Sequence, residues 1–420
     1  MISREENLHV FSLIFLRMFL SSGSAGLSKP INSALTEIVG LVTAQNGPGL
    51  REKLFSLISS STLGRSDFVS IKEEMVAKKI PNGFEFITEF FMYMQTRGLA
   101  TSPEGNAVSL ETLSTGCLRK LIGAYIEHAW LLPVLMSMMT LVRKRACEMD
   151  SPTSDKWKKK IVEIFRELFP VLHKERDRLP GTCWLICQLL NLYMELDQVK
   201  LCSHILAALT QSLAREGGFD PTSVPKSVSV TLFYYWGKFH VMESKYQDAH
   251  AKLVWAFANC SHAGNRKRIA EYLIPSMIVI GVFPKHEMIS TSGLDHFEGL
   301  VSAIRIGDVE SYNVLLESHA HVLAKSGTLV LMEKCKLICY RNLAKRTYII
   351  LKEITSETAK FDLSAYEAAW NFAEHASKNE AICALADLIY AGAMKGYMAL
   401  EHDKLVLSKV NPFPSIDSIL

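Results

Sequence analysis

The sequence has no run of about 18 consecutive apolar residues, the length that a helix needs to cross a membrane. Its best candidate, residues 269–283, is interrupted by Glu271 and Pro275. A second apolar stretch, residues 8–20, contains Arg17 and follows acidic residues where a secretory signal would be basic. We therefore expect no membrane insertion, and we interpret residues 8–20 as a buried amphipathic helix.

The chain has only nine cysteines among 420 residues, an odd number without the spacing of a disulfide framework. This usage is typical of a reducing compartment, the cytosol or the nucleus. Two pairs, Cys183/Cys187 and Cys335/Cys339, are spaced four apart, but no nearby histidine or cysteine completes the ligands of a structural zinc site. We interpret both pairs as core cysteines and predict neither a metal site nor a cofactor.

Catalytic motifs are also missing. The sequence has no Gly-x-Ser-x-Gly elbow, and its 13 histidines do not cluster. His286 and Glu287 begin a zincin-like pattern, but position 290 is a serine where the second histidine would stand. We predict that the protein is not an enzyme and has no small-molecule substrate. The alternative requires an active site within residues 1–115, where titratable side chains do not converge.

Hydrophobic residues make up 49% of the chain and charged residues 21%, the composition of a folded globular protein. The formal net charge is +3, so any surface for nucleic acid has to be local. Most apolar residues recur with the helical period, and strand-like alternation is almost absent before about the last 30 residues. We therefore predict an all-α protein.

Residues 116–331 are predicted to form an array of helical hairpins. The helical stripes end at short turns, for example at Asp197 and before Gly281. Paired helices of this kind are typical of a tetratricopeptide-like solenoid, in which each hairpin exposes an apolar flank that the next one covers. Residues 1–115 are less regular, and we expect short helices with exposed loops there. The helices expected in the array span residues 183–196, 202–213, 229–242, 246–257 and 268–280.

Residues 332–414 are predicted to cap the array, with a tail over residues 415–420. After three helical stretches the period changes to two, which indicates a β-hairpin. Three helices followed by a β-hairpin is the winged-helix plan, a relative of the helix-turn-helix. The helices are expected over residues 332–353, 363–373 and 379–390, and the strands over 396–400 and 405–409.

Several cations of this winged-helix module are candidate nucleic-acid-binding residues. They would neutralise phosphates without reading the base sequence. The alternatives are a solvated hairpin edge, which lysine protects from unwanted strand pairing, and plain solvent exposure of the helix. The candidates are Lys395 at the start of the hairpin, Lys404 and Lys409 on it, His402 at its tip, and Arg341 and Lys345 on one face of the first helix.

Short stretches spread over residues 229–414 carry a resemblance to a known family. They are Tyr235-Trp236-Gly237-Lys238, Leu253-Val254-Trp255-Ala256-Phe257, Tyr272-Leu273-Ile274-Pro275, Cys339-Tyr340-Arg341-Asn342-Leu343, Leu388-Ile389-Tyr390, Leu405-Val406-Leu407-Ser408-Lys409 and Asn411-Pro412-Phe413-Pro414. This range resembles a PCI domain, the module shared by proteasome-lid, signalosome and translation-initiation-factor subunits. Lys238 stands where that family usually has arginine, which keeps the charge.

The last three stretches, together with residues 180–215, look like one subfamily. It comprises the PCI subunit of the nuclear transcription-and-export complex and its signalosome-associated relative. The resemblance implies a non-catalytic scaffold subunit that acts in mRNA export, in the nucleus and at the nuclear pore, with some protein in the cytoplasm. The implied partners are a larger PCI-like scaffold protein, a small acidic subunit, and RNA or DNA held on a basic winged-helix face. The alternative is a protein-only subunit of a signalosome-like or proteasome-lid-like assembly.

Overall fold

The structure is a computed structural model that describes residues 29–59, 76–99, 103–151, 153–214, 218–355 and 359–416. The helix predicted over residues 8–20 lies outside these residues. The chain divides into two compact units, Met1–Leu232 and Phe233–Leu420. This boundary differs from the three-part division at residues 115/116 and 331/332, which stays a prediction.

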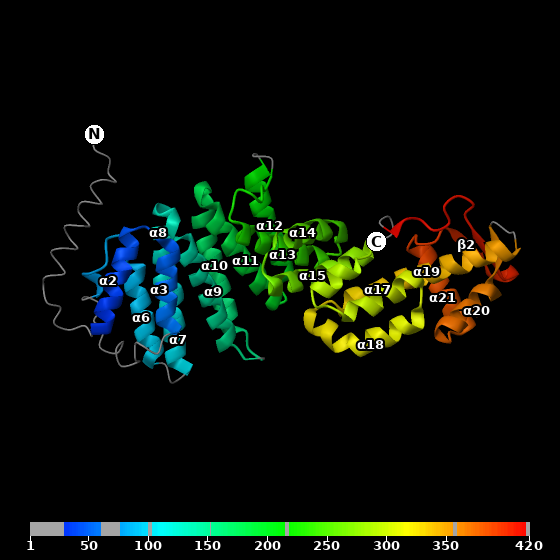
Figure 1. Ribbon diagram of the computed structural model, residues 1–420, viewed down its shortest axis with the longest axis horizontal. Helices are drawn as coiled ribbons and strands as arrows, with labels where there is room; N and C mark the ends of the chain where they lie inside the picture. Colours follow the sequence, from blue (N-terminus) through cyan, green and yellow to red (C-terminus); the bar gives the residue numbers. More distant parts are fainter. Residues whose placement is uncertain are drawn as a thin grey trace. The chain divides into compact units, whose positions relative to one another are not determined.

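Helices build the described part of the first unit. Those that follow one another in sequence pack together, since α9 contacts α10, α10 contacts α11 and α11 contacts α12 (Figure 1). The helices are α2 (Lys29–Thr43), α3 (Gly47–Ser59), α6 (Phe86–Leu99), α7 (Pro103–Glu111), α8 (Leu118–Glu127), α9 (Leu132–Met149), α10 (Lys156–Lys174), α11 (Leu179–Glu195) and α12 (Val199–Leu213), with a π-helical turn over Thr112–Cys117.

The packing of α10 shows how the sequence specifies these helices. Ile161, Phe165 and Leu168 recur at the helical period, and all three are buried. Helix α11 and helix α12 correspond to the two helices predicted over residues 183–196 and 202–213. Asp197, which stands between them, adopts a positive φ of 57°, so the predicted break is confirmed.

The second unit continues the helical repeats. Helix α13 begins in the first unit and ends in the second. Gly237 brings α13 close to α14, because a Cβ at this position would lie 2.6 Å from Cγ of Leu253. The helices are α13 (Lys226–Met242), α14 (Tyr246–Asn259), α15 (Ala263–Val279), α16 (His286–Thr291), α17 (His296–Ile306) and α18 (Val309–Ser326).

Helix α19 (Leu329–Thr355) joins the repeats to the winged-helix module. Its first half packs in the core of the repeats, where Met332, Cys335 and Ile338 are buried with residues of α15, α17 and α18. Its second half packs in a separate core, through Ala344 and Tyr348, with residues of the winged helix. The start predicted at residue 332 therefore falls inside a continuous helix of 27 residues.

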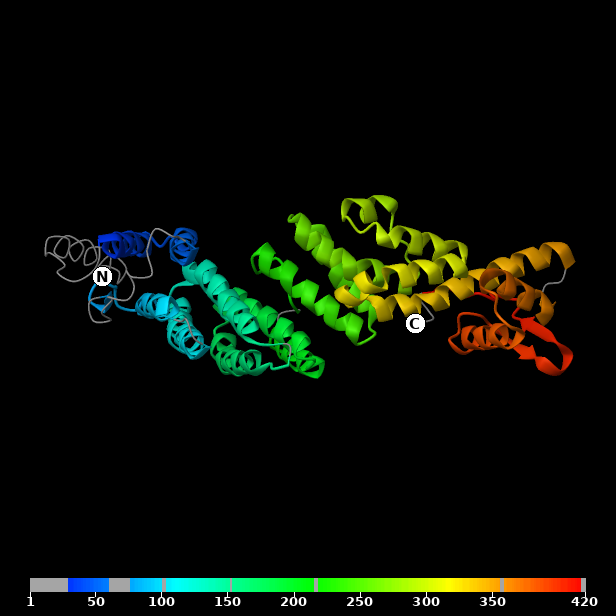
Figure 2. The same ribbon diagram turned by 90° about the horizontal axis from the view of Figure 1, so that it is seen from below.

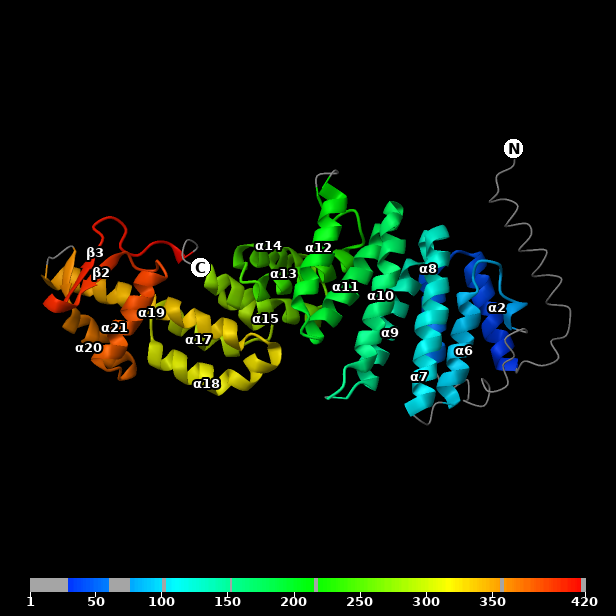
Figure 3. The same ribbon diagram turned by 180° about the vertical axis from the view of Figure 1, so that it is seen from behind.

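The winged helix itself is completed by α20 (Leu363–Glu374), α21 (Lys378–Tyr390) and a three-stranded antiparallel sheet of order β1-β3-β2. Figure 3 labels β2 and β3 together with α20 and α21, and Figure 2 shows this module, in orange and red, from below. Strands β2 (Gly396–Ala399) and β3 (Lys404–Leu407) form the predicted hairpin, and a short 3-10 turn, Leu400–His402, lies at its tip. Strand β1 (Lys360–Asp362) was not predicted. The fold class is confirmed: an all-α helical-hairpin solenoid with a C-terminal winged helix.

Cys183, Cys187, Cys335 and Cys339 are buried in the cores, as the sequence predicted. Burial raises the pKa of the Cys183 thiol to about 12, so this group stays protonated and behaves as an apolar side chain. Over the described residues, we find no helix with the length and apolarity that a membrane span requires.

Candidate functional site

Lys395 and Lys409 lie together at the base of the β2–β3 hairpin. The backbone carbonyl of Lys395 accepts a hydrogen bond of 2.8 Å from the backbone N–H of Ser408, which extends the strand pairing by one residue. The backbone N–H of Lys395 donates to the carbonyl of Pro412, also at 2.8 Å. Both lysine side chains are exposed, and neither forms an ion pair with a residue that the structure describes. The base therefore presents two unneutralised cations on a fixed backbone.

At the tip of the hairpin the cations are paired. Lys404 stands opposite Asp362 in the β1–β3 register, and the two side chains form an ion pair. Lys378, at the start of α21, lies 3.0 Å from a carboxylate oxygen of Glu367 and 2.9 Å from one of Asp403. The hydrogen bonds to these carboxylates raise the pKa of Lys378.

The exposed His402 also lies at this tip. The Asp362 carboxylate largely cancels the charge that Lys404 was predicted to contribute to a basic surface.

Strand β1 adds a residue that sequence reasoning missed. In the sheet, Lys360 pairs with Val406 and Val406 pairs with Tyr397, so these three residues share one face. The intervening row, Phe361 and Leu405, points into the core. Lys360 is exposed without an ion pair to any described residue, and Tyr397 is 61% exposed. Lys360 and Tyr397 thus lie on one face with strand β3 between them. An exposed lysine and an open aromatic ring on one face suit single-stranded nucleic acid.

Arg341 is not on an exposed basic face, and this part of the prediction is wrong. Its side chain is buried, and its guanidinium donates to the backbone carbonyls of Phe413 and Pro414. Burial lowers the pKa of the guanidinium. Arg341 therefore fixes the C-terminal segment Asn411–Pro414 against α19 and is unavailable to a phosphate.

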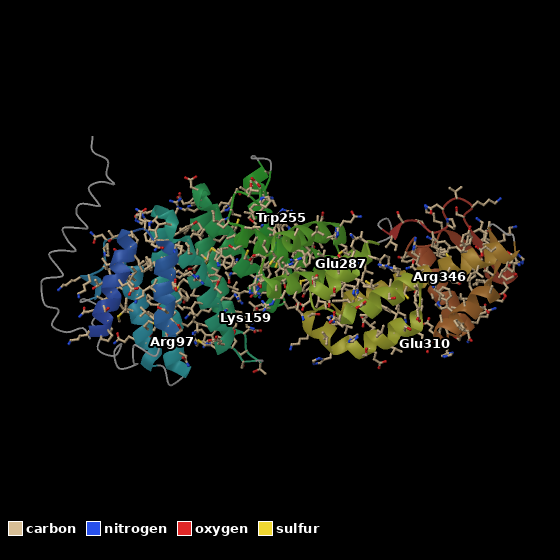
Figure 4. All side chains as sticks on the ribbon, viewed as in Figure 1. Arg97, Lys159, Trp255, Glu287, Glu310 and Arg346 are labelled. Atoms are coloured by element: carbon tan, nitrogen blue, oxygen red, sulfur yellow. The ribbon has the colours of Figure 1, made fainter. Side chains whose placement is uncertain are left out.

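Lys345, one turn beyond Arg341, is exposed and forms no ion pair with the described residues. It lies between Arg341 and Tyr348 in the sequence of α19, and the Tyr348 ring is 5.6 Å from that of Phe413. Lys345 is therefore near the same C-terminal segment that supports Lys395. Its neighbour Arg346, which Figure 4 labels, instead donates to the backbone carbonyl of Ile306 at 2.7 Å.

A shallow groove of about 490 Å³ lies elsewhere on the second unit, between α19, α21 and the turn after α13. Its lining carries cations and carboxylates together. Lys334 donates to the Tyr246 hydroxyl at 3.0 Å, and Lys336 lies 3.6 Å from a carboxylate oxygen of Glu374. Each cation of this groove is thus already engaged. Among the described residues, no group of three or more histidine, cysteine or acidic side chains is arranged to hold a metal ion.

The winged-helix surface therefore combines Lys345, Lys360, Lys395 and Lys409 with Tyr397. Together they can bind phosphate groups by charge and stack a base on an exposed ring.

Comparison with known proteins gives relatives over most of the chain, although no model of a protein family matches it. A "PCI domain-containing protein 2 homolog" of Drosophila melanogaster is 28% identical over 334 residues, covering 76% of this chain and 82% of the relative. "PCI domain-containing protein 2" of Xenopus laevis is 28% identical over 330 residues, covering 74% and 80%. "Protein CSN12 homolog" of Schizosaccharomyces pombe is 28% identical over 244 residues, covering 56% and 55%.

Proposed function

The chain is a PCI-domain protein, and on this premise we propose that it is a non-catalytic scaffold subunit of a nuclear mRNA-export complex. In this complex it binds a larger PCI-like scaffold protein and a small acidic subunit, and it contributes its winged helix to RNA or DNA binding. Its site of action is the nucleus, including the nuclear pore, with some protein in the cytoplasm.

The observation that carries the nucleic-acid part is the base of the hairpin. Lys395 and Lys409 are exposed there and form no ion pair with a described residue. Lys345 is exposed one helical turn beyond Arg341, whose guanidinium holds the same C-terminal segment. Cations that are not neutralised by neighbouring carboxylates retain their full attraction for phosphates. Because no side chain of this set is arranged to hydrogen-bond a particular base edge, we expect binding that depends on salt and little on sequence.

The partner part of the proposal is supported by the resemblance to export-complex subunits and by the length over which the relatives align. Purification of the tagged full chain from nuclear extract, followed by mass spectrometry, tests it. We expect a larger PCI-like protein, a small acidic protein and mRNA-bound factors in near-stoichiometric amounts. Recovery of the chain alone, or with proteins unrelated to mRNA, would contradict the proposal.

A second candidate is a protein-only subunit of a signalosome-like or proteasome-lid-like assembly. It is favoured by the fission-yeast relative named "Protein CSN12 homolog". The same purification separates the two. Copurification with deubiquitylating subunits, without mRNA factors and without nucleic-acid affinity, would support this candidate over the export complex.

A further inference from the structure

The first unit contains a small polar pocket between α6, α7 and α9, which we call the arginine pocket. It has a volume of about 130 Å³, and its lining includes Arg97 of α6, Ser109 of α7 and Arg145 of α9. One water molecule occupies about 30 Å³ in the liquid, so the pocket holds roughly four waters. This space suits one tetrahedral oxyanion and is too small for a nucleotide.

The two arginines of this pocket have donors to spare. Arg97 donates to the backbone carbonyl of Ile58 at 3.1 Å and forms no ion pair with a residue that the structure describes. Arg145 lies 3.0 Å from a carboxylate oxygen of Glu148, which also lines the pocket and whose side chain is 60% exposed. A guanidinium presents five N–H groups in a planar fork, which matches the oxygens of phosphate and carboxylate groups.

Tyr93 is buried in the lining of the arginine pocket, with a side chain that is 1% exposed. Its hydroxyl has no hydrogen-bond partner among the described residues, but the hydroxyl oxygen is itself enclosed and does not open onto the pocket. The two guanidiniums are therefore the donors that a bound oxyanion would meet.

The first turn of α10 lies beside the α7 side of the pocket. Lys160 of this turn is 3.2 Å from Glu111, the last residue of α7. Lys156 and Lys159 are exposed and form no ion pair with a described residue, and Lys156 lies 5.4 Å from the centre of the Trp157 ring. Figure 4 labels Lys159 and Arg97 in the lower half of the first unit. The Asp150 carboxylate already accepts hydrogen bonds from the backbone N–H groups of Trp157 and Lys158, so an acidic partner would meet the exposed lysine side chains and not the helix start itself.

We propose that the arginine pocket binds the phosphoryl group of a phosphoserine or phosphothreonine in an acidic protein segment. The flanking carboxylates of that segment lie along the lysines of the first turn of α10. A phosphate monoester fits the pocket because it ends in free oxygens, whereas a nucleic-acid phosphodiester continues on both sides. Tyr93, the aromatic residue of the pocket lining, is buried and offers no face on which a base could stack.

The test uses the full chain and a fluorescein-labelled peptide, Asp-Glu-phosphoserine-Glu-Asp, with its unphosphorylated counterpart, measured by fluorescence anisotropy. We expect the phosphorylated peptide to bind about tenfold more tightly than the serine peptide. Arg97→Gln and Arg145→Gln should each remove most of this preference. Glu148→Gln should tighten binding of the phosphorylated peptide, because it frees Arg145 and removes a negative charge from the rim.

Thermal unfolding guards against a purely structural effect of the arginine variants, because each variant should keep the midpoint of the parent while it loses the preference for the phosphorylated peptide. Arg119→Gln is the matched control, because Arg119 is an exposed arginine of the same unit outside the pocket.

The proposal is overturned if both peptides bind equally, or if their ratio survives in the Arg97 and Arg145 variants. It is also overturned if inorganic phosphate binds as tightly as the phosphorylated peptide, which would make the pocket an ion site. If oligouridylate binds more tightly than the phosphorylated peptide, and this binding depends on Arg97, the ligand of the pocket is RNA and the proposal is wrong.

Discussion

Two lysines lie at the base of the β2–β3 hairpin and two around its tip, one of which belongs to α21, but the two places differ in the carboxylates that surround them. At the tip, Lys404 faces Asp362 across the sheet, and Lys378 lies between two carboxylates. At the base, Lys395 and Lys409 have no such neighbours among the described residues. The field available to a phosphate depends on this pairing, which the count of lysines in the sequence does not reveal.

The comparison also shows that the base depends on a buried support. Lys395 is hydrogen-bonded through its backbone to Pro412, and the residues that follow Pro412 accept hydrogen bonds from Arg341. Lys395 and Lys409 are exposed and can bind a ligand. The buried Arg341 instead holds the backbone segment that supports them.

The substitution expected to have the largest effect on the base of the hairpin is Arg341→Ala. Removing this side chain leaves the carbonyls of Phe413 and Pro414 buried without a donor, so we expect the free energy of unfolding to fall by about 2–3 kcal/mol. Urea unfolding followed by circular dichroism measures this change. Arg346→Ala is the control on the same helix, because Arg346 is exposed, and its loss should stay below about 1 kcal/mol. Equal losses in the two variants would contradict the supporting role of Arg341.

The next effect concerns charge alone. Lys395→Gln/Lys409→Gln should weaken binding of single-stranded RNA about tenfold and reduce the slope of log K against log salt by about two. Lys378→Gln/Lys404→Gln removes the same charge from the tip and should change the affinity by less than about threefold. Filter binding at several salt concentrations provides both values. A tip variant that behaves like the base variant would show that the pairing at the tip is irrelevant.

A smaller effect is expected at the cap of α21, beside the tip. The Ser377 side chain accepts from the Glu380 N–H, and the Glu380 carboxylate accepts from the Ser377 N–H, forming a capping box. Ser377→Ala should lower the free energy of unfolding by about 1 kcal/mol and leave RNA affinity unchanged. Thermal unfolding of the variant and parent tests the first part. A loss of RNA affinity would mean that tip and base are coupled.

This cap also has a predictable pH dependence. Hydrogen bonds from the backbone and side chain of Ser377 lower the pKa of Glu380 below its unfolded value of about 4.3. The stabilisation is therefore complete above the unfolded pKa and is lost as the pH falls through the lower folded value. The stability difference between parent and Ser377→Ala should accordingly shrink in acid.

The smallest effect is expected for the ion pair at the tip. Lys404 and Asp362 are both substantially exposed, so Lys404→Gln should change the free energy of unfolding by only about 0.5 kcal/mol. A double-mutant cycle with Asp362→Asn isolates the interaction. A coupling above about 1 kcal/mol would mean that the pair holds β1 in the sheet.

Much of the architecture could be predicted from the sequence, because helical periodicity is local information. The three helices and the hairpin of the winged helix follow from apolar spacing and from turn residues such as Gly392. Strand β1 could not be predicted in this way, since its three residues are too few to show alternation. Lys360 was missed for the same reason.

Arg341 shows a second limit. Its position in α19 suggests an exposed basic face, because Lys345 lies four residues away on a helix rich in lysine. What buries it is a segment more than 70 residues later in the chain, whose carbonyls accept its hydrogen bonds. A contact of this kind depends on tertiary structure and cannot be inferred from local sequence. The same holds for the ion pair between Lys404 and Asp362.

Helix α19 has a consequence for how this protein can be divided. Helix α19 is continuous and contributes side chains to both hydrophobic cores. A fragment that starts at residue 332 would lack the first turn of this helix, and Cys335 and Ile338 would become exposed to solvent. We expect the recombinant wing alone to aggregate, and a longer piece that includes α15, α17 and α18 to remain in solution. A fragment of the C-terminal half therefore has to keep all of α19 together with α15, α17 and α18, the helices that cover its first half.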